Sequence, residues 1–243
     1  MCWERGRSLQ KQNNSPKGVV ILLHGLRRKS RSMAKMAAFF QDNGYITANI
    51  NYPSTKKKIE DIAADHLAVA VEDIRNKYGK SIPSHFITHS MGGIIVRSYL
   101  QTASLPQGSR IVMLAPPNHG SEIVDKLRKF KWFKRIMGIA ALQLSTDKDS
   151  VPNSLKRVSA EIGIIMGAST IDPVSSKMLP SGNDGKVTIE SARLEEMSDF
   201  LLITKVSHAF IMKNKIVMQQ ALYFVENGAF LRDNSVKLQN RVV

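Results

Sequence analysis

The stretch that decides the fold is "FITHSMGG", from Phe86 to Gly93, in which a serine stands between a histidine and two glycines. The residues before Ser90 are typical of a buried strand, and those after it are typical of a helix. A tight strand-to-helix turn projects its middle residue out of the sheet, where a serine can act as a nucleophile. The usual pattern is G-x-S-x-G; here Thr88 replaces the first glycine and Gly92 keeps the second. The structural alternative is an ordinary serine that caps the helix.

Outward from this turn, short apolar runs alternate with helical patterns along most of the chain. Strands are predicted at residues 18–25, 45–53, 84–90, 110–117, 161–169 and 200–207, and helices at 32–44, 59–79, 91–103 and 215–228. Such alternation predicts an α/β fold with a mainly parallel sheet of about six strands and helices on both faces. The stretch from 118 to about 155 interrupts the alternation. We expect it to be a short helical cap, inserted into a single domain of residues 1–243.

Composition places the chain among ordinary globular proteins. Its 243 residues suffice for one sizeable core, and 43% of them are apolar and 23% charged. No apolar run approaches the ~18 residues of a membrane span, and the basic N-terminus "MCWERGRSLQKQNNSPKG" lacks the apolar stretch of a secretory signal. The single cysteine, Cys2, permits no internal disulfide, which fits a reducing compartment. We therefore expect a cytoplasmic location, with export left open if a signal has been removed.

An attacking serine also needs backbone N–H groups that stabilise the developing oxyanion. One is predicted to be the N–H of Met91, which directly follows the serine at the start of the helix. The second is predicted from the loop after the first strand, "LLHGLRRKS", where Gly25 permits a sharp turn and the N–H of Leu26 can point into the site. We expect His24 to order this loop by hydrogen bonding rather than to take part in chemistry.

Taken together, these segments resemble the α/β-hydrolases of the bacterial lipase and esterase type. The resemblance runs from about residue 18 to 228 and rests on "LLHGL", "ITHSMGG", "LAPPNHGSE", "NDGKVTIES" and "VSHAFIMKN". It implies a serine hydrolase whose catalytic residues follow one another in the order serine, acid, histidine. The usual sheet of this fold has further strands before the first one found here, so the resemblance implies a minimal version of the fold.

Six histidines are candidates for the base that activates Ser90. The implied chain order excludes the four that precede the serine: His24, His66, His85 and His89. His89 is also excluded because neighbouring side chains in a sharp turn point apart. His119 lies near the predicted site but before any candidate acid, whereas His208 directly follows the last predicted strand. The predicted base is therefore His208.

Two aspartates follow the fifth predicted strand and could orient this base. Asp172 lies in "STIDPVSS" and Asp184 in "SGNDGKVTIES", and position alone does not separate them. A carboxylate there would accept the Nδ1–H of His208 and stabilise its charged form. The resemblance favours Asp184, because the acid of this family often stands in an N-D-G-x-V setting. The same Asn-Asp-Gly letters also describe a simple turn.

Basic residues gather in three clusters, and the chain carries a net charge of +15. The clusters are "RRKSR" (27–31), "KKK" (56–58) and the cap sequence "DKLRKFKWFKRIMGIAALQL", and all three follow carboxyl ends of predicted strands. A basic amphipathic helix with aromatic residues can contact an anionic membrane. It can equally bind anionic head groups or coenzyme A esters, or cover the pocket with its lysines in water. Nucleic-acid binding is not expected, because no such motif accompanies the clusters.

The sequence thus predicts an enzyme that hydrolyses carboxylic esters with an apolar acyl chain, through a covalent acyl-enzyme on Ser90. The sequence contains no zinc-binding or dinucleotide-binding motif, so we expect neither a metal nor a cofactor. One alternative is an acyltransferase or thioesterase with the same catalytic residues. The other is a non-catalytic lipid-binding member of the fold.

Overall fold

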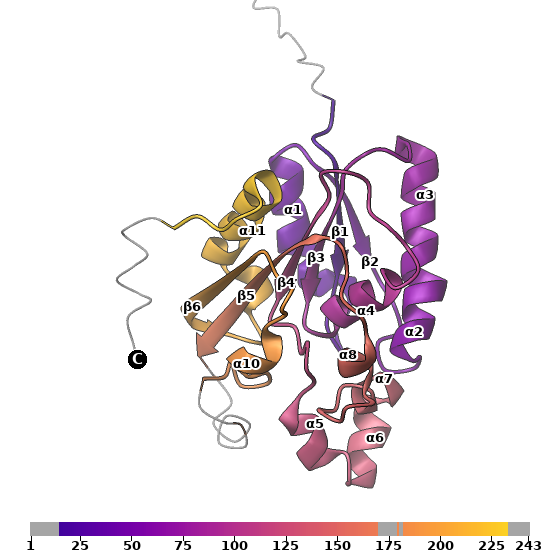
Figure 1. Cartoon of the computed structure of the whole chain (residues 1–243), viewed down its shortest axis with the longest axis vertical. Helices are drawn as coiled ribbons and strands as arrows, with labels where there is room; N and C mark the ends of the chain where they lie inside the picture. Colours follow the sequence, from indigo (N-terminus) through magenta and orange to yellow (C-terminus); the bar gives the residue numbers. More distant parts are fainter. Residues whose placement is uncertain (1–14, 170–178, 180–181, 233–243) are drawn as a thin grey trace, which may run out of the picture.

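The computed structural model of the chain describes residues 15–169, 179 and 182–232. Within these ranges, six strands form one sheet in the order β2-β1-β3-β4-β5-β6, and every pairing is parallel (Figure 1). In chain order, the strands are β1 (Val19–Leu23), β2 (Ile46–Ile50), β3 (Ser84–His89), β4 (Arg110–Leu114), β5 (Glu161–Ser169) and β6 (Asp199–Ser207).

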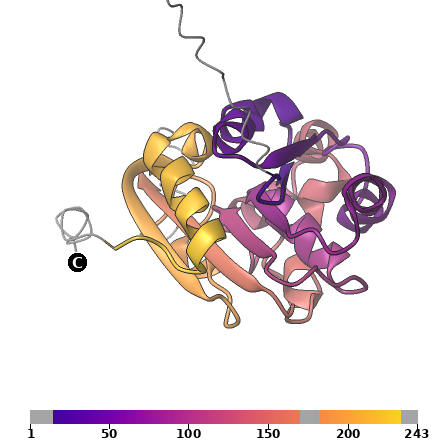
Figure 2. The same ribbon diagram turned by 90° about the horizontal axis from the view of Figure 1, so that it is seen from above.

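Helices cover both faces of the sheet. On one face, α1 (Ala34–Asp42) and α11 (Lys215–Asn227) lie side by side (Figures 1 and 2). The other face carries α2 (Ile59–Ile62), α3 (Val69–Tyr78) and α4 (Met91–Tyr99). This arrangement confirms the predicted fold class. The described chain outside the cap also contains the short helical segments η1 (Ser30–Met33), α10 (Ile189–Ala192) and η3 (Ile211–Lys213).

The central strands are buried on both faces, as the continuous apolar run of β1 predicts. Every residue of β1 is 0% exposed, and the apolar residues of β3 and β4 are equally buried. The edge strand β2 is partly exposed along its whole length. Because the helices occupy both faces, the carboxyl ends of the strands are left as the place where loops can form a site.

The helix predicted at 59–79 is wound less regularly than expected. A π-helical turn, η2 (Ala63–Ala68), separates α2 from α3. Ile59, Leu67 and Ile74 are buried across all three segments, so the apolar face continues through the wider turn. The spacing of apolar residues therefore predicts the helix correctly but carries no sign of the change in hydrogen bonding.

The segment between β4 and β5 lies beyond the carboxyl ends of the strands (Figure 1). The sequence predicts a short helical cap here, and the structure has α5 (Glu122–Leu127), α6 (Lys131–Met137), α7 (Ile139–Leu142) and α8 (Val151–Ser154). The break after α6 falls at Gly138, whose φ is +79°. A Cβ at Gly138 would stand 1.8 Å from the carbonyl oxygen of Thr55, so only glycine fits this close approach. No helix in the described ranges is both long and apolar enough to cross a bilayer.

Candidate active site

Ser90 occupies a strained turn between β3 and α4. Its backbone has φ 52° and ψ −124°, in a region that residues other than glycine avoid. Its N–H donates to the carbonyl oxygen of Leu114, in the neighbouring strand β4, over 2.8 Å. Strain of this kind costs about 1–3 kcal/mol and persists where the surrounding structure enforces it, commonly at functional sites. The turn brings Ser90 to the wall of a cavity beneath the cap.

Close packing beneath this turn requires Gly92. A Cβ there would lie 2.9 Å from the carbonyl oxygen of Leu23 in β1, so a larger residue would push α4 away from the sheet. Thr88 stands where the usual pattern has its first glycine. Its side chain is fully buried between the neighbouring elements, so the fold accommodates this larger residue.

Three side chains far apart in the sequence meet beside the turn. The Oγ of Ser90 lies 3.1 Å from Nε2 of His208, and Nδ1 of His208 lies 2.7 Å from Oδ2 of Asp184. Because a carboxylate only accepts, Nδ1 carries the proton and Nε2 is left to accept the Ser90 O–H. The structure thus brings together the three residues that the sequence singled out. Asp172, the other candidate acid, lies outside the described residues.

The Asn-Asp-Gly turn itself holds Asp184 in place. Asn183 Oδ1 accepts the N–H of Gly185 over 2.9 Å, which closes a local turn. Asp184 Oδ1 accepts the N–H groups of Lys186 and Val187 over 3.0 and 2.9 Å. Asp184 is 1% exposed. The Asn-Asp-Gly sequence therefore forms a turn and also positions a carboxylate beside His208, so both interpretations of it hold.

The two predicted oxyanion donors belong to the loop after β1 and to the first turn of α4. Met91 is the first residue of α4, so its N–H has no acceptor within the helix. Leu26 lines the same cavity as Ser90. Neither N–H donates to another residue within the described ranges. The turn at Arg27, with φ 56°, is held by its N–H, which donates to Ser54 Oγ over 3.0 Å.

His89 contacts the backbone of His208. Its Nε2 lies 3.0 Å from the carbonyl oxygen of His208, and since a carbonyl only accepts, this nitrogen donates. Burial lowers the pKa of His89 well below its ordinary value, and the nearby positive charge of Arg28 lowers it further. His89 is therefore neutral and acts as a hydrogen-bond donor that positions the loop carrying His208.

His24 orders the loop after β1, which agrees with the role expected for it. Its Nδ1 lies 2.9 Å from the carbonyl oxygen of Gly25, and its Nε2 accepts the N–H of Tyr52 over 3.4 Å. The rings of His24 and Tyr52 stack with centroids 3.9 Å apart. Burial lowers the pKa of His24, so one neutral tautomer satisfies both hydrogen bonds.

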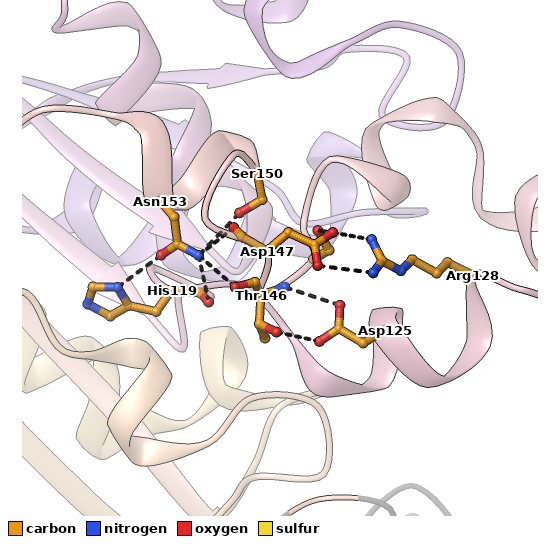
Figure 3. Close-up of polar contacts among 8 residues, drawn as sticks. His119, Asp125, Arg128, Thr146, Asp147, Ser150 and Asn153 are labelled. Atoms are coloured by element: carbon orange, nitrogen blue, oxygen red, sulfur yellow. Dashed lines mark hydrogen bonds and ion pairs between the residues drawn. The ribbon is translucent and has the colours of Figure 1, made fainter.

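The other three histidines are not among the described residues that line the cavity around Ser90. His85 accepts the N–H of Arg110 over 3.2 Å, and burial lowers its pKa to about 4. Nδ1 of His119 lies 3.2 Å from Oδ1 of Asn153, within the cap (Figure 3). His66 lies in the π-helical turn. Across the described ranges, no three or more His, Cys, Asp or Glu side chains are grouped so as to hold a metal ion.

A cavity of about 720 Å³ lies between the catalytic candidates and the cap. Much of its wall is apolar and comes from the cap, including Ile123, Val124, Leu127, Phe133, Ile136 and Leu144. Cations line it as well, from Arg27 and Arg28 on the loop after β1. The cavity can therefore hold an apolar chain next to Ser90.

Polar contacts hold the loop between α7 and α8 against α5 (Figure 3). Asp147 accepts from both terminal nitrogens of Arg128, one of them over 3.0 Å. Asp125 accepts from the N–H and the hydroxyl of Thr146, over 3.1 and 2.6 Å. Arg128, which belongs to the basic cap sequence, is therefore paired inside the cap rather than free to meet a partner.

Arg28 belongs to the basic cluster "RRKSR", but its contact with the loop that carries His208 is not predicted by the sequence. Its Nη2 donates to the carbonyl oxygen of Ala209 over 3.0 Å, next to His208. The loop that carries Arg28 was visible in "LLHGLRRKS", but this contact joins residues 181 positions apart. No local pattern marks such a contact.

Comparison with known proteins assigns the chain to a family. The sequence matches the hydrolase family described as serine aminopeptidase, S33, over residues 14–163, more than half of its 243 residues. No protein of curated function matches it. The mature lipase BlEst2 of Bacillus licheniformis is 22% identical, with a TM-score of 0.68, and the match covers 88% of this chain and 94% of the lipase.

Two further solved structures share the fold at lower identity. Phospholipase PlaB of Legionella pneumophila is 18% identical, with a TM-score of 0.69 over 88% of this chain and 60% of the phospholipase. The metagenomic carboxyl esterase MGS0156 is 16% identical, with a TM-score of 0.60 over 81% of this chain and 66% of the esterase. The chain therefore belongs to the S33 serine aminopeptidase-like family of α/β-hydrolases, and it shares its fold with bacterial lipases and esterases.

Proposed function

We propose that the chain is a serine hydrolase that cleaves carboxylic esters with an apolar acyl chain. The observation that carries the proposal is the contact of His208 with both Ser90 and Asp184, at 3.1 and 2.7 Å, beside a mainly apolar cavity. Each of the three side chains has the partner that a nucleophile, a base and an orienting acid require. The cavity offers the acyl chain a place next to the attacking oxygen.

In the proposed mechanism, Nε2 of His208 takes the proton of Ser90 as Oγ attacks the ester carbonyl. Asp184 keeps the other proton on Nδ1 and stabilises the charged imidazole. The N–H groups of Leu26 and Met91 stabilise the oxyanion of the tetrahedral intermediate. His208 then gives its proton to the leaving alcohol. A water molecule activated by the same ring finally releases the acid from Ser90.

Peptides with a free amino terminus suit this cavity less well, although the family description names an aminopeptidase. A buried ammonium group needs an acidic partner. Asp184 is the one carboxylate among the described residues of the cavity wall, and it already accepts from His208 and two backbone N–H groups. Arg27 and Arg28 on the same wall would repel an ammonium group. These charges favour ester substrates over aminopeptidase substrates.

Two measurements on the wild-type protein test the proposal. We expect a fluorophosphonate to label the peptide that contains Ser90, and p-nitrophenyl esters to turn over faster as the acyl chain lengthens, until it fills the cavity. An alcohol competing with water as the acceptor separates a hydrolase from an acyltransferase, and matched thioesters test for a thioesterase. Absence of both labelling and turnover would instead favour a lipid-binding member of the fold.

Asp184→Asn is expected to lower kcat by about 10⁴-fold with little change in KM. The amide cannot stabilise the charged imidazole, and it favours the wrong tautomer of His208. The measurement is steady-state hydrolysis of a short ester, with circular dichroism to verify folding. Asp172→Asn serves as the comparison and is expected to be mild. If Asp172→Asn proves the more damaging of the two in folded protein, the acid has been assigned to the wrong residue.

An exposed apolar surface on the cap supports a further part of the proposal, peripheral contact with an anionic membrane. We call this surface the cap patch: it comprises Phe130, Trp132, Ile136 and Ile139, which are 43, 51, 48 and 39% exposed. Trp132 and Ile136 also line the cavity, so the cap patch adjoins the site. Four exposed cations are interleaved with these apolar residues: Lys129, Lys131, Lys134 and Arg135. Apolar side chains among cations fit an anionic lipid surface.

Vesicle co-sedimentation of the inactive Ser90→Ala protein tests this contact. We expect binding to anionic but not to neutral vesicles, and weaker binding at high salt because ions screen the attraction. Each cation near an anionic bilayer contributes about 1 kcal/mol, so replacing Lys131 and Lys134 together by Gln should lower binding about 30-fold. Replacing Lys77 and Lys80, which are exposed at the opposite end of the sheet, should have little effect. Equal binding to both lipids, or to neither, would contradict the proposed contact with anionic membranes.

A further inference from the structure

The charge of Arg28 has no acidic counterpart in the described part of the chain. Its guanidinium donates to the carbonyl oxygen of Ala209 over 3.0 Å, and no described carboxylate lies within ion-pair distance. A guanidinium has five N–H donors, so most of them remain available. Other arginines of the chain do have carboxylate partners, among them Arg110, Arg128, Arg157 and Arg232.

This charge, which has no ion-pair partner among the described carboxylates, lies at the proposed site rather than in open solvent. Arg28 is half-buried on the wall of the cavity that also contains Ser90. Burial lowers the pKa of Arg28, and its charge in turn lowers the pKa of His89. A cation withdrawn from water without a counter-ion costs free energy, and such costs are retained where a ligand or a reaction uses the charge. With Asp184 already bonded, the cavity wall presents positive charge to its contents.

The place of Arg28 indicates which end of a substrate meets the charge. His208 must reach the leaving alcohol oxygen in order to protonate it, and Arg28 contacts the next residue, Ala209. The apolar wall, by contrast, comes from the cap segments around Val124 and Phe133. A substrate whose acyl chain lies beneath the cap therefore directs its alcohol part toward Arg28.

We propose that Arg28 forms an anion subsite, and that the preferred substrates are esters whose alcohol part carries a phosphate or carboxylate group. Both groups present oxygen pairs that a guanidinium fork can bind through two parallel hydrogen bonds. The exposed cation Arg27, from the same loop, adds to the positive field at the mouth. This inference rests on the proposed ester hydrolysis and adds the charge of the substrate to it.

Three matched butyrate esters test the subsite. Methyl 4-(butyryloxy)benzoate is neutral, 4-(butyryloxy)benzoate carries a carboxylate, and 4-(butyryloxy)phenyl phosphate carries a phosphate. The value of kcat/KM is measured for each ester with the wild type, Arg28→Gln and Arg31→Gln. Arg31→Gln removes the same charge from an exposed position of the same basic cluster, outside the cavity wall. Comparing the anionic-to-neutral ratio between proteins cancels the intrinsic reactivity of the esters.

We expect the anionic-to-neutral ratio of kcat/KM to fall at least ~10-fold in Arg28→Gln, because a hydrogen bond to a charged group is lost. In Arg31→Gln the ratio should stay at the wild-type value. Arg28→Lys keeps the charge without the fork, so its ratio should lie between those of the wild type and Arg28→Gln. A larger fall for the phosphate ester than for the carboxylate ester, or the reverse, identifies which anion the subsite prefers.

Two results would overturn the inference, and they are distinguishable. If the wild type hydrolyses the neutral ester and Arg28→Gln leaves the ratio unchanged, there is no anion subsite, while ester hydrolysis stands. If the wild type turns over none of the three esters and takes up no fluorophosphonate, the proposed function fails together with the subsite.

Discussion

Ser90→Ala is expected to abolish fluorophosphonate labelling and to lower kcat for ester hydrolysis by about 10⁶-fold, the loss seen when a catalytic serine is removed. The reason is geometric. Two other serines, Ser121 and Ser207, line the same cavity, but only the Oγ of Ser90 lies within 3.1 Å of Nε2 of His208. The Ser121 hydroxyl is also occupied, because it donates to a backbone carbonyl over 3.0 Å. Labelling followed by peptide mapping, with turnover of a short ester, measures both effects.

A matched control separates loss of the nucleophile from loss of structure. Ser98→Ala removes the same hydroxyl from α4, the helix that begins after Ser90, and Ser98 does not line the cavity. It should label and turn over like the wild type, and both variants should melt as the wild type does. Labelling that persists in Ser90→Ala would place the nucleophile elsewhere, with Ser121 and Ser207 as the first residues to replace.

The fold could be predicted because its signals are local. Residues 19–23 form a continuous apolar run, and strands that are covered on both faces bury such runs. The helices between them show an apolar face at helical spacing, and Gly44 and Gly79 follow their ends. Alternation of the two patterns then leaves a parallel sheet as the solution, because each strand needs a crossover to reach the next.

The cap could not be predicted at the same level, because its shape depends on contacts with distant residues. The sequence predicts a helical cap but not where its helices end, and α6 ends where Gly138 closely approaches Thr55. Thr55 belongs to the loop after β2, and no residue near Gly138 in the sequence indicates that the two will be in contact. The pairing of Arg128 with Asp147, which lies 19 positions further along the chain, likewise neutralises one cation of the cap.

The candidate site likewise contains residues that local patterns predict and contacts that no local pattern predicts. Ser90, Leu26 and Met91 were found from local turns, because a strand-to-helix turn fixes the positions of its own neighbours. His208 and Asp184 could be assigned only with the order serine, acid, histidine that the family resemblance implies. Contacts such as Arg28 with the carbonyl oxygen of Ala209 have no local signal at all, since they form only when two loops from opposite ends of the chain meet.

His208→Ala is expected to lower kcat by at least about 10³-fold, and His89→Ala to cost far less, although both rings lie near Ser90. Nε2 of His208 faces the Ser90 hydroxyl, whereas Nε2 of His89 donates to the carbonyl oxygen of His208. Removing His208 removes the base. Removing His89 leaves a carbonyl without its donor, which should lower the free energy of unfolding by about 1–3 kcal/mol and loosen the loop that carries the base.

Chemical rescue separates these two roles more sharply than the size of the loss. Added imidazole can enter the space left by the partly exposed His208 side chain and accept the Ser90 proton, so it should restore part of the activity of His208→Ala. It should not restore His89→Ala, because that ring is 1% exposed and takes no proton from Ser90. The measurement is initial rate against imidazole concentration for both variants, with thermal melting in parallel. Rescue of His89→Ala but not of His208→Ala in folded protein would show that the base is the neighbour of the serine, and that chain order misleads in this protein.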